Sequence, residues 1–226
     1  MRFPLRRLVA PVAVACLLSA CLGGIAVAPA NAAGITSTVT GFNNPQGVAV
    51  LPDGSAVYVT DYGNNAIKVI DPATNTVTTT ISLNSGSPAY TQPVGITVSP
   101  DGAYIYVTAN GPALPSGTTD GILKIATATN TISSWSTPGL TTKSGISINP
   151  AGTRLYLAQA NNSSGTVRVV QISDMTIVAT ISNLNAASGC NGTGWISGTA
   201  ISGDGTKMYV ACNGTNNYRC DGNYTD

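Results

Sequence analysis

Side chains that could do acid–base, nucleophilic or metal chemistry are few in this sequence. Its 226 residues contain no His, and all nine acidic residues are Asp. A His-based catalytic triad, a haem with His ligands and an imidazole acid–base step are therefore excluded. A Cys nucleophile would lack the same imidazole partner. We expect no catalytic residue, no metal site and no cofactor in this chain.

Three of the aspartates occupy the same place in a repeated turn. Asp53, Asp101 and Asp204 each directly precede a Gly. In such turns an Asp side chain usually accepts hydrogen bonds from the nearby backbone and takes no part in catalysis. The last six residues, "DGNYTD" at 221–226, offer oxygen atoms but lack the ligand spacing of a calcium loop. We interpret these acidic residues as structural.

The first 32 residues have the composition of an export signal. Three Arg are followed by an apolar run and by Ala30-Asn31-Ala32, which suits cleavage after Ala32. A membrane anchor is the alternative, but Pro11 and the small, Gly-containing residues of the run disfavour it. We predict a signal peptide at 1–32 and a secreted, periplasmic or cell-surface location for 33–226.

A second processing route competes with cleavage after Ala32. "LSAC" at 18–21 resembles a bacterial lipobox, in which Cys21 would carry a lipid and become the first residue of the processed protein. We favour cleavage after Ala32 because the apolar stretch continues past Cys21, where a lipoprotein normally has a polar tether. Membrane contact is expected only through such a lipid anchor.

The remaining cysteines gather near the end of the chain. An oxidising compartment would permit one disulfide among Cys190, Cys212 and Cys220 and would leave one thiol. The sequence alone does not choose among the three pairings. An odd number also indicates that a partner cysteine could lie outside this chain.

Charge is scarce along the whole sequence. Only 8% of the residues are charged, where soluble domains average about 25%. Loss of the three signal arginines takes the net charge from +1 to −2, and no basic stripe is present that could neutralise phosphates. We exclude nucleic acid as a partner and expect a glycan, a peptide or a protein of unknown identity.

An internal repeat determines the elements that must position these residues. Four segments begin with a Gly, carry a second Gly seven residues later and a Tyr four residues after that. The aligned sets are Gly47/Gly54/Tyr58, Gly95/Gly102/Tyr106, Gly145/Gly152/Tyr156 and Gly198/Gly205/Tyr209. Short β-branched or aromatic runs flank the second Gly, and turns such as Pro52-Asp53-Gly54 join them. Each unit therefore predicts a β-hairpin.

A second hairpin follows the first in three of the four units, at 66–81, 121–136 and 166–181. Four strands per unit and a period of 48 to 53 residues are the signature of a β-propeller blade. We predict an all-β propeller fold with about three full four-stranded blades and a partial fourth. Their approximate bounds are 43–81, 91–136, 143–181 and 195–226.

The strand that ends each first hairpin resembles the Tyr-Val-Thr-Asn strand of the YVTN-type β-propeller repeat family. The chain has "YVTD" at 58–61 and "YVTA" at 106–109, with looser versions at 156–159 and 209–212. "SPDG" or a relative lies upstream, and "IDPATNTV" lies downstream. The resemblance extends over nearly all of 42–217, although no unit keeps the fourth-position Asn. It implies a secreted or cell-surface binding propeller; related propellers include lactonases and electron-transfer enzymes.

The strand count leaves the last blade incomplete. "ITSTVTGF" at 35–42 reads as the outer strand of another blade, and the tail 212–226 ends where the third strand of the fourth blade should begin. We interpret the chain as a fragment of a propeller of six or seven blades, with a small closed ring as the alternative. An isolated blade buries too little apolar surface to be stable, so we interpret the repeated Tyr as packing against neighbouring blades.

Binding is expected on the face of the blades where loop lengths vary. From the repeated Tyr to the next strand is 8 residues in the first unit, 15 in the second and 10 in the third. Loops on a fixed scaffold often carry binding sites, and amides with aromatic rings suit sugars or peptides. Solvated turn residues are the simpler interpretation. The candidate ligand-binding residues are Tyr62, Asn64, Asn65, Tyr90, Gln92, Asn110, Asn161, Asn162 and Trp195.

Cys190 and Cys212 map to the same variable face, which favours their pairing over that of Cys212 with Cys220. For the whole protein, we favour an exported, non-enzymatic binding module. The alternative is a lactonase-like or other propeller enzyme whose catalytic residues lie in blades outside this sequence.

Overall fold

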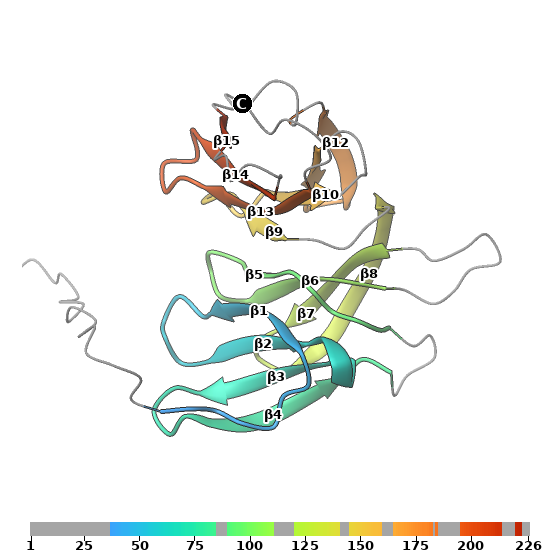
Figure 1. The fold of residues 1–226 in the computed structure, drawn as a ribbon. Helices are drawn as coiled ribbons and strands as arrows, with labels where there is room; N and C mark the ends of the chain where they lie inside the picture. The colour runs from blue at the N-terminus through green and yellow to red at the C-terminus, as the bar shows by residue number, and fades with distance from the viewer. Residues whose placement is uncertain are drawn as a thin grey trace, which may run out of the picture. The chain divides into compact units, whose positions relative to one another are not determined.

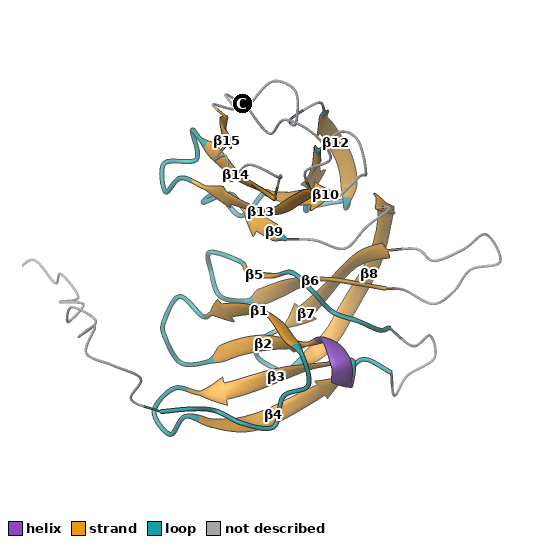
Figure 2. Ribbon diagram, viewed as in Figure 1, coloured by secondary structure: helices purple, strands orange, loops and turns teal. Residues whose placement is uncertain are grey.

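β-Strands make up nearly all of the regular secondary structure in the described part of the chain (Figures 1 and 2). A computed structural model describes residues 37–84, 90–110, 120–140, 145–159, 165–182, 184, 195–213 and 220–222. All of them belong to one compact unit, Ser37–Asp226. The predicted signal peptide, with Cys21, lies outside the described residues.

The strands form four antiparallel sheets in which consecutive strands are neighbours. Blade 1 holds β1 (Pro45–Val50), β2 (Val57–Asp61), β3 (Ala66–Asp71) and β4 (Thr76–Ser82). Blade 2 holds β5 (Ile96–Val98), β6 (Tyr104–Asn110), β7 (Asp120–Ala126) and β8 (Thr131–Leu140). Blade 3 holds β9 (Ile146–Ile148), β10 (Arg154–Gln159), β11 (Thr166–Gln171) and β12 (Thr176–Ile181). Blade 4 holds β13 (Trp195–Ile201), β14 (Met208–Asn213) and β15 (Cys220–Gly222).

These sheets confirm the predicted fold class: an all-β protein with three full four-stranded blades and a partial fourth. Two segments differ from prediction. The described part of the expected N-terminal strand, residues 37–42, forms no strand. Conversely, Cys220–Gly222 pairs with β14 as a third strand of blade 4, where the sequence pattern predicted only two. A Cys-Asp-Gly sequence has little strand propensity, so pairing along β14 decides its conformation.

The second Gly of each repeat unit is required by its backbone conformation. Gly54, Gly102, Gly152 and Gly205 all lie in the left-handed region, at φ of 73, 72, 68 and 75 degrees. Each of their N–H groups donates to a carbonyl three residues earlier, for example Gly54 to Leu51 at 2.8 Å. Glycine adopts this region without a steric penalty, which explains the invariant spacing within the four units.

The same turns contact one another from blade to blade. A Cβ added at Gly102 would lie 3.3 Å from the ring of Pro52, in the preceding blade. The same proline-over-glycine contact recurs for Pro100 with Gly152 and for Pro150 with Gly205.

Successive blades pack through two different faces. In blade 1, Tyr58 lies opposite Val69 and Thr60 lies opposite Ile67, and all four side chains share what we call the tyrosine face. Val59 and Asp61 point to the other side, which we call the opposite face. The aligned positions of the other blades follow the same alternation.

Every inter-blade core joins a tyrosine face to the opposite face of the next blade. Tyr58 belongs to one apolar cluster with Val107 and Leu123 of blade 2. Tyr106 clusters with Leu155 and Leu157 of blade 3, and Tyr156 with Met208 and Val210 of blade 4. These three tyrosines are each 2% exposed, which confirms their packing role, whereas the fourth, Tyr209 of blade 4, is 44% exposed and is not packed in this way by any described residue. Burial, with the nearby charges of Asp101 and Tyr104, raises the pKa of Tyr106 to about 12.

The first strands of the blades lie next to one another, β1 beside β5, β5 beside β9 and β9 beside β13. The Thr60 hydroxyl donates to the carbonyl of Val94 at 2.8 Å, just before β5. Gly145 N–H donates to the carbonyl of Ser197 in β13 at 3.2 Å. Neighbouring blades are therefore joined by hydrogen bonds beside their inner strands as well as by apolar packing.

Candidate functional site

The connection between β2 and β3 carries three of the predicted binding residues. Asp61 ends β2, and the short 3-10 helix η1 (Tyr62–Asn64), purple in Figure 2, follows at once. Asn65 then adopts the left-handed conformation, with φ and ψ both 49 degrees, and its N–H donates to the Tyr62 carbonyl at 3.3 Å. Asn tolerates this conformation better than most residues, so the sequence favours a tight turn here.

Asn65 fastens this turn to the segment that leads into blade 2. Its side-chain Oδ1 accepts a hydrogen bond from the Gln92 N–H at 2.8 Å, and its carbonyl accepts one from the Leu83 N–H at 2.9 Å. The Tyr90 N–H donates to the Leu83 carbonyl at 2.7 Å, and the Tyr90 ring packs against the apolar cluster between blades 1 and 2.

Five predicted binding residues are thus brought together in what we call the loop cluster. Asn64 is exposed, and the other four members are half-buried. The cluster consists of Tyr62, Asn64, Asn65, Tyr90 and Gln92.

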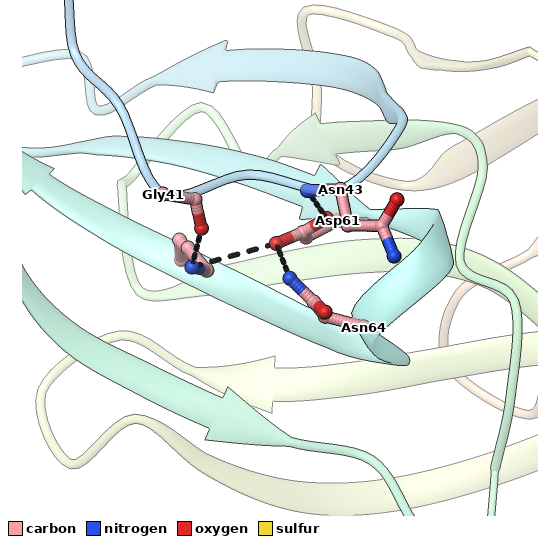
Figure 3. A network of polar contacts seen from close by, with 5 residues as sticks. Gly41, Asn43, Asp61 and Asn64 are labelled. Atoms are coloured by element: carbon pink, nitrogen blue, oxygen red, sulfur yellow. Dashed lines mark hydrogen bonds and ion pairs between the residues drawn. The ribbon is translucent and has the colours of Figure 1, made fainter.

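A buried carboxylate holds the loop cluster to the blade (Figure 3). The Asp61 side chain is fully buried and lies 3.5 Å from the ammonium of Lys68, which is 13% exposed. Asp61 also accepts hydrogen bonds from the Asn43 N–H at 2.8 Å and from the Asn64 amide at 2.7 Å. An ionised carboxylate is stable in such a place only when it is paired and hydrogen-bonded, as it is here.

Lys68 also contacts the segment that precedes β1. Its ammonium donates to the carbonyl of Gly41 and lies over the ring of Phe42, 5.2 Å from the ring centre. This is a cation–π arrangement. Residues 41–43 therefore cover the Asp61–Lys68 pair.

The corresponding positions in the next blades hold different partners. In blade 2 they are Ala109 and Leu123, both fully buried. In blade 3 they are Gln159 and Arg168, with the Arg168 Nε donating to the Gln159 Oε1 at 2.5 Å. Each pair consists of diagonal neighbours on adjacent strands. Because both members change together, we interpret Asp61 and Lys68 as a structural pair. The one hint of this pair in the sequence is that Asp61 stands where the YVTN-type repeat has an Asn.

A cavity of about 350 Å³ lies among the short turns, away from the loop cluster. Hydrogen bonds from the Ser55 backbone and hydroxyl lower the pKa of Asp53, and a hydrogen bond from the Ser99 hydroxyl lowers the pKa of Asp101. Both carboxylates are thus engaged within their own turns, as predicted for these aspartates. The lining residues are Leu51, Pro52, Asp53, Ser55, Asp101, Gly102, Thr127 and Ala128.

Several predicted site residues remain predictions. Asn161, Asn162 and Cys190 lie outside the described residues, and only the backbone is described at Asn110, Trp195, Cys212 and Cys220. Across the described ranges, no group of three His, Cys, Asp or Glu side chains could hold a metal ion. No helix among those same residues is long and apolar enough to cross a membrane.

One family model matches part of the chain. The NHL repeat, a β-propeller-type repeat, matches residues 42–70, from just before β1 into β3. The PE-PGRS family protein PE_PGRS18 of Mycobacterium tuberculosis (strain ATCC 25618 / H37Rv) is 53% identical over 51 residues. That alignment covers 23% of this chain and 11% of the relative, so the chain spans only a small part of that protein's length.

Among solved structures, the chain is similar to the hydrazine synthase of Kuenenia stuttgartiensis. The TM-score is 0.46 and the sequence identity is 16%, over 80% of this chain and 59% of that one. A likeness at this level carries no argument about activity.

Proposed function

We propose that this protein is an exported, non-enzymatic β-propeller that binds a glycan, a peptide or another protein through the loop cluster. The observation that carries this proposal is the fastening of the 61–65 turn to Leu83 and Gln92 by the side chain and backbone of Asn65. A rigid base of this kind lowers the ordering cost of binding. The half-buried Tyr62 supplies an aromatic ring, and the exposed Asn64, whose amide nitrogen is held by Asp61, supplies a side-chain oxygen; an aromatic ring and an amide oxygen suit a sugar or a peptide.

The other parts of the proposal rest on the sequence. Export rests on the signal-like segment 1–32, and the non-enzymatic assignment rests on the lack of His and Glu. We also assign the repeats to the YVTN type, on the "YVTD" and "YVTA" strands at 58–61 and 106–109. These features together support a location outside the cytoplasm and a role in recognition.

Glycan and peptide arrays probed with the purified chain test the proposed binding surface. We expect Tyr62→Ala to weaken binding of any array ligand about tenfold or more, because aromatic contacts often dominate such surfaces. The same assay with Trp195→Ala tests Trp195, a predicted binding residue outside the loop cluster. Val178→Ala is the control, since Val178 is a 51% exposed apolar residue on β12, remote in sequence from the loop cluster.

Equal binding by Tyr62→Ala and the unmodified chain would remove the loop cluster from the proposal. An unchanged signal for Trp195→Ala alone would remove only that residue. Circular dichroism of each variant verifies that the blades are still folded.

A further inference from the structure

The hydroxyl of the repeated Tyr in blade 1 is satisfied by the next blade. The Tyr58 hydroxyl donates to the side-chain Oδ1 of Asn130 at 2.9 Å. Asn130 lies in the turn between β7 and β8 and adopts the left-handed conformation, with φ of 54 degrees. Asn75 holds the same place in the turn between β3 and β4, with φ of 55 degrees. Asn suits this conformation and also supplies the acceptor that a buried Tyr hydroxyl usually finds.

Blade 3 has a methionine at this turn position. Met175 follows the end of β11 by four residues, as Asn130 follows the end of β7, and its φ is 56 degrees. A residue without the short polar side chain of Asn adopts this conformation at a steric cost. The Met175 side chain is half-buried and packs against the apolar cluster that contains Tyr106 and Leu155. A thioether therefore stands where blades 1 and 2 have an amide.

Tyr106, the counterpart of Tyr58 in blade 2, is left without a hydrogen-bond partner. The repeat places its hydroxyl beside the blade 3 turn that contains Met175. Tyr106 is 2% exposed, and no described residue donates a hydrogen bond to its hydroxyl or accepts one from it. Burial raises its pKa to about 12, so the hydroxyl keeps its proton at neutral pH and remains a donor. A buried donor without an acceptor is destabilising, and a thioether sulfur is only a weak acceptor.

One oxygen atom on the Met175 sulfur would supply the missing acceptor. In reaction with hydrogen peroxide, the sulfur lone pair attacks one peroxide oxygen, the O–O bond breaks, and a sulfoxide and water are formed. Met175 is partly open to solvent, whereas Met208, the other methionine of 33–226, is 3% exposed within the cluster between blades 3 and 4. Peroxide should therefore react with Met175 first.

We propose that Met175 is a peroxide-oxidation site whose sulfoxide oxygen accepts a hydrogen bond from the Tyr106 hydroxyl and so strengthens the contact between blades 2 and 3. Oxidation of a methionine at an apolar cluster ordinarily destabilises a protein, because an apolar side chain becomes polar. Here the buried hydroxyl reverses the sign of the effect. Both residues lie at an interface between two described blades, and the proposal does not depend on ligand binding by the loop cluster.

Thermal unfolding of the full chain before and after treatment with hydrogen peroxide tests this inference. Mass spectrometry of the intact chain and of its peptides locates the added oxygen. We expect one oxygen on Met175 and an unfolding temperature that rises by about 2–4 °C. In Tyr106→Phe the same oxidation should lower the unfolding temperature, because the sulfoxide then has no donor. This variant should fold, since it removes only a hydroxyl that has no partner.

Two variants of the turn provide matched controls. Met175→Leu retains an apolar side chain without sulfur, so peroxide should leave its unfolding temperature unchanged; this separates Met175 from Met208 and the cysteines. Met175→Asn copies the turn of blade 2 and should raise the unfolding temperature without peroxide. The increase should be smaller when Tyr106→Phe is also present.

Three results would overturn the inference. One is oxidation of Met208 before Met175. Another is the same shift on oxidation, in either direction, for Tyr106→Phe and the unmodified chain, which would mean that the sulfoxide does not meet the hydroxyl. The third is a fall in the unfolding temperature of the unmodified chain once Met175 alone is oxidised.

Discussion

At the scale of single residues, the same two diagonal positions hold a different combination of side chains in each of blades 1, 2 and 3. Asp61 with Lys68 is charged, and the aligned pair in blade 2, Ala109 with Leu123, is apolar. The pair in blade 3, Gln159 with Arg168, is a single charge held by an amide. The same strands accommodate all three pairs. The fold therefore requires two side chains that suit each other at these positions, whether charged, polar or apolar.

We predict that Asp61→Ala destabilises the chain by about 3 kcal/mol, because removal of one partner leaves a poorly solvated charge and two unsatisfied donors. Adding Lys68→Leu should restore most of the loss, since it copies the pair present in blade 2. Equilibrium urea unfolding of the two variants and of Lys68→Leu alone gives the coupling free energy. If the double variant is no more stable than Asp61→Ala, the pair is not a matched unit.

The residues of the loop cluster show what the sequence could and could not indicate. Loop position and amide content pointed to Asn64, Asn65 and Gln92. Their structural duties were not predictable, because the hydrogen bond from Gln92 to Asn65 joins residues 27 positions apart. The burial of Asp61 was equally hidden, since an Asp after a strand is normally taken as an exposed turn residue.

At the scale of elements, glycine and tyrosine spacing determines the hairpins. The second Gly of each unit provides the left-handed turn, and the Tyr marks the buried face of the next strand. The same approach failed for residues 35–42. Their alternating Thr and Val residues resemble a strand, but 37–42 joins no ladder, and Gly41 and Asn43 are held by Lys68 and Asp61 instead.

Two aligned glycines should respond oppositely to alanine. Gly145→Ala places a Cβ 2.7 Å from the backbone of Gly198 and 2.8 Å from the Ser197 carbonyl oxygen. These backbone atoms cannot easily move aside, so we expect a loss of about 1–3 kcal/mol. Gly198→Ala has open space and should change stability by less than about 0.5 kcal/mol. Thermal unfolding in dilute solution measures both.

Because both variants are measured at low protein concentration, self-association does not contribute to the difference in their unfolding temperatures. Equal effects of the two substitutions would mean that the backbone conformation at these two positions, and not the close approach of the next inner strand, determines the requirement for glycine. A large loss for Gly198→Ala alone would contradict the packing arrangement described for blades 3 and 4.

At the scale of the whole molecule, stability comes from contacts between consecutive blades. Each of the three apolar clusters contains residues from two neighbouring blades. Tyr106 of blade 2 belongs to the cluster shared with blade 3, whereas Ile105 of the same strand belongs to the cluster shared with blade 1. Blade 2 therefore has packed neighbours on both faces, and blade 4 has one on a single face among the described residues.

Amide hydrogen exchange should report this difference. We expect the slowest exchange in β6 and β7, which lie between two apolar clusters, and faster exchange in β14 and β15, where Tyr209 is open to solvent. Mass spectrometry of quenched, digested samples at low protein concentration measures it. Protection of β14 equal to that of β6 would show that unfolding is fully cooperative across the blades.

The number and type of strands in each blade were largely readable from the repeat. Which face of a blade meets which neighbour was not, because alternating residues on both faces of β2, such as Tyr58 and Val59, are equally suited to burial. The exposure of Val48 and Tyr209 depends on what lies beside a blade, which the repeat pattern does not encode.

The proline-over-glycine contacts between neighbouring turns have a practical consequence for protein engineering. An inserted peptide tag beside Gly102 would separate that residue from Pro52 and disturb two blades at once. By contrast, the connections from each repeated Tyr to the following strand already differ in length from unit to unit. Reporter peptides, epitope tags or fused domains should therefore be placed in the second or third of those connections, where added sequence does not force neighbouring turns apart and leaves the loop cluster in the first connection intact.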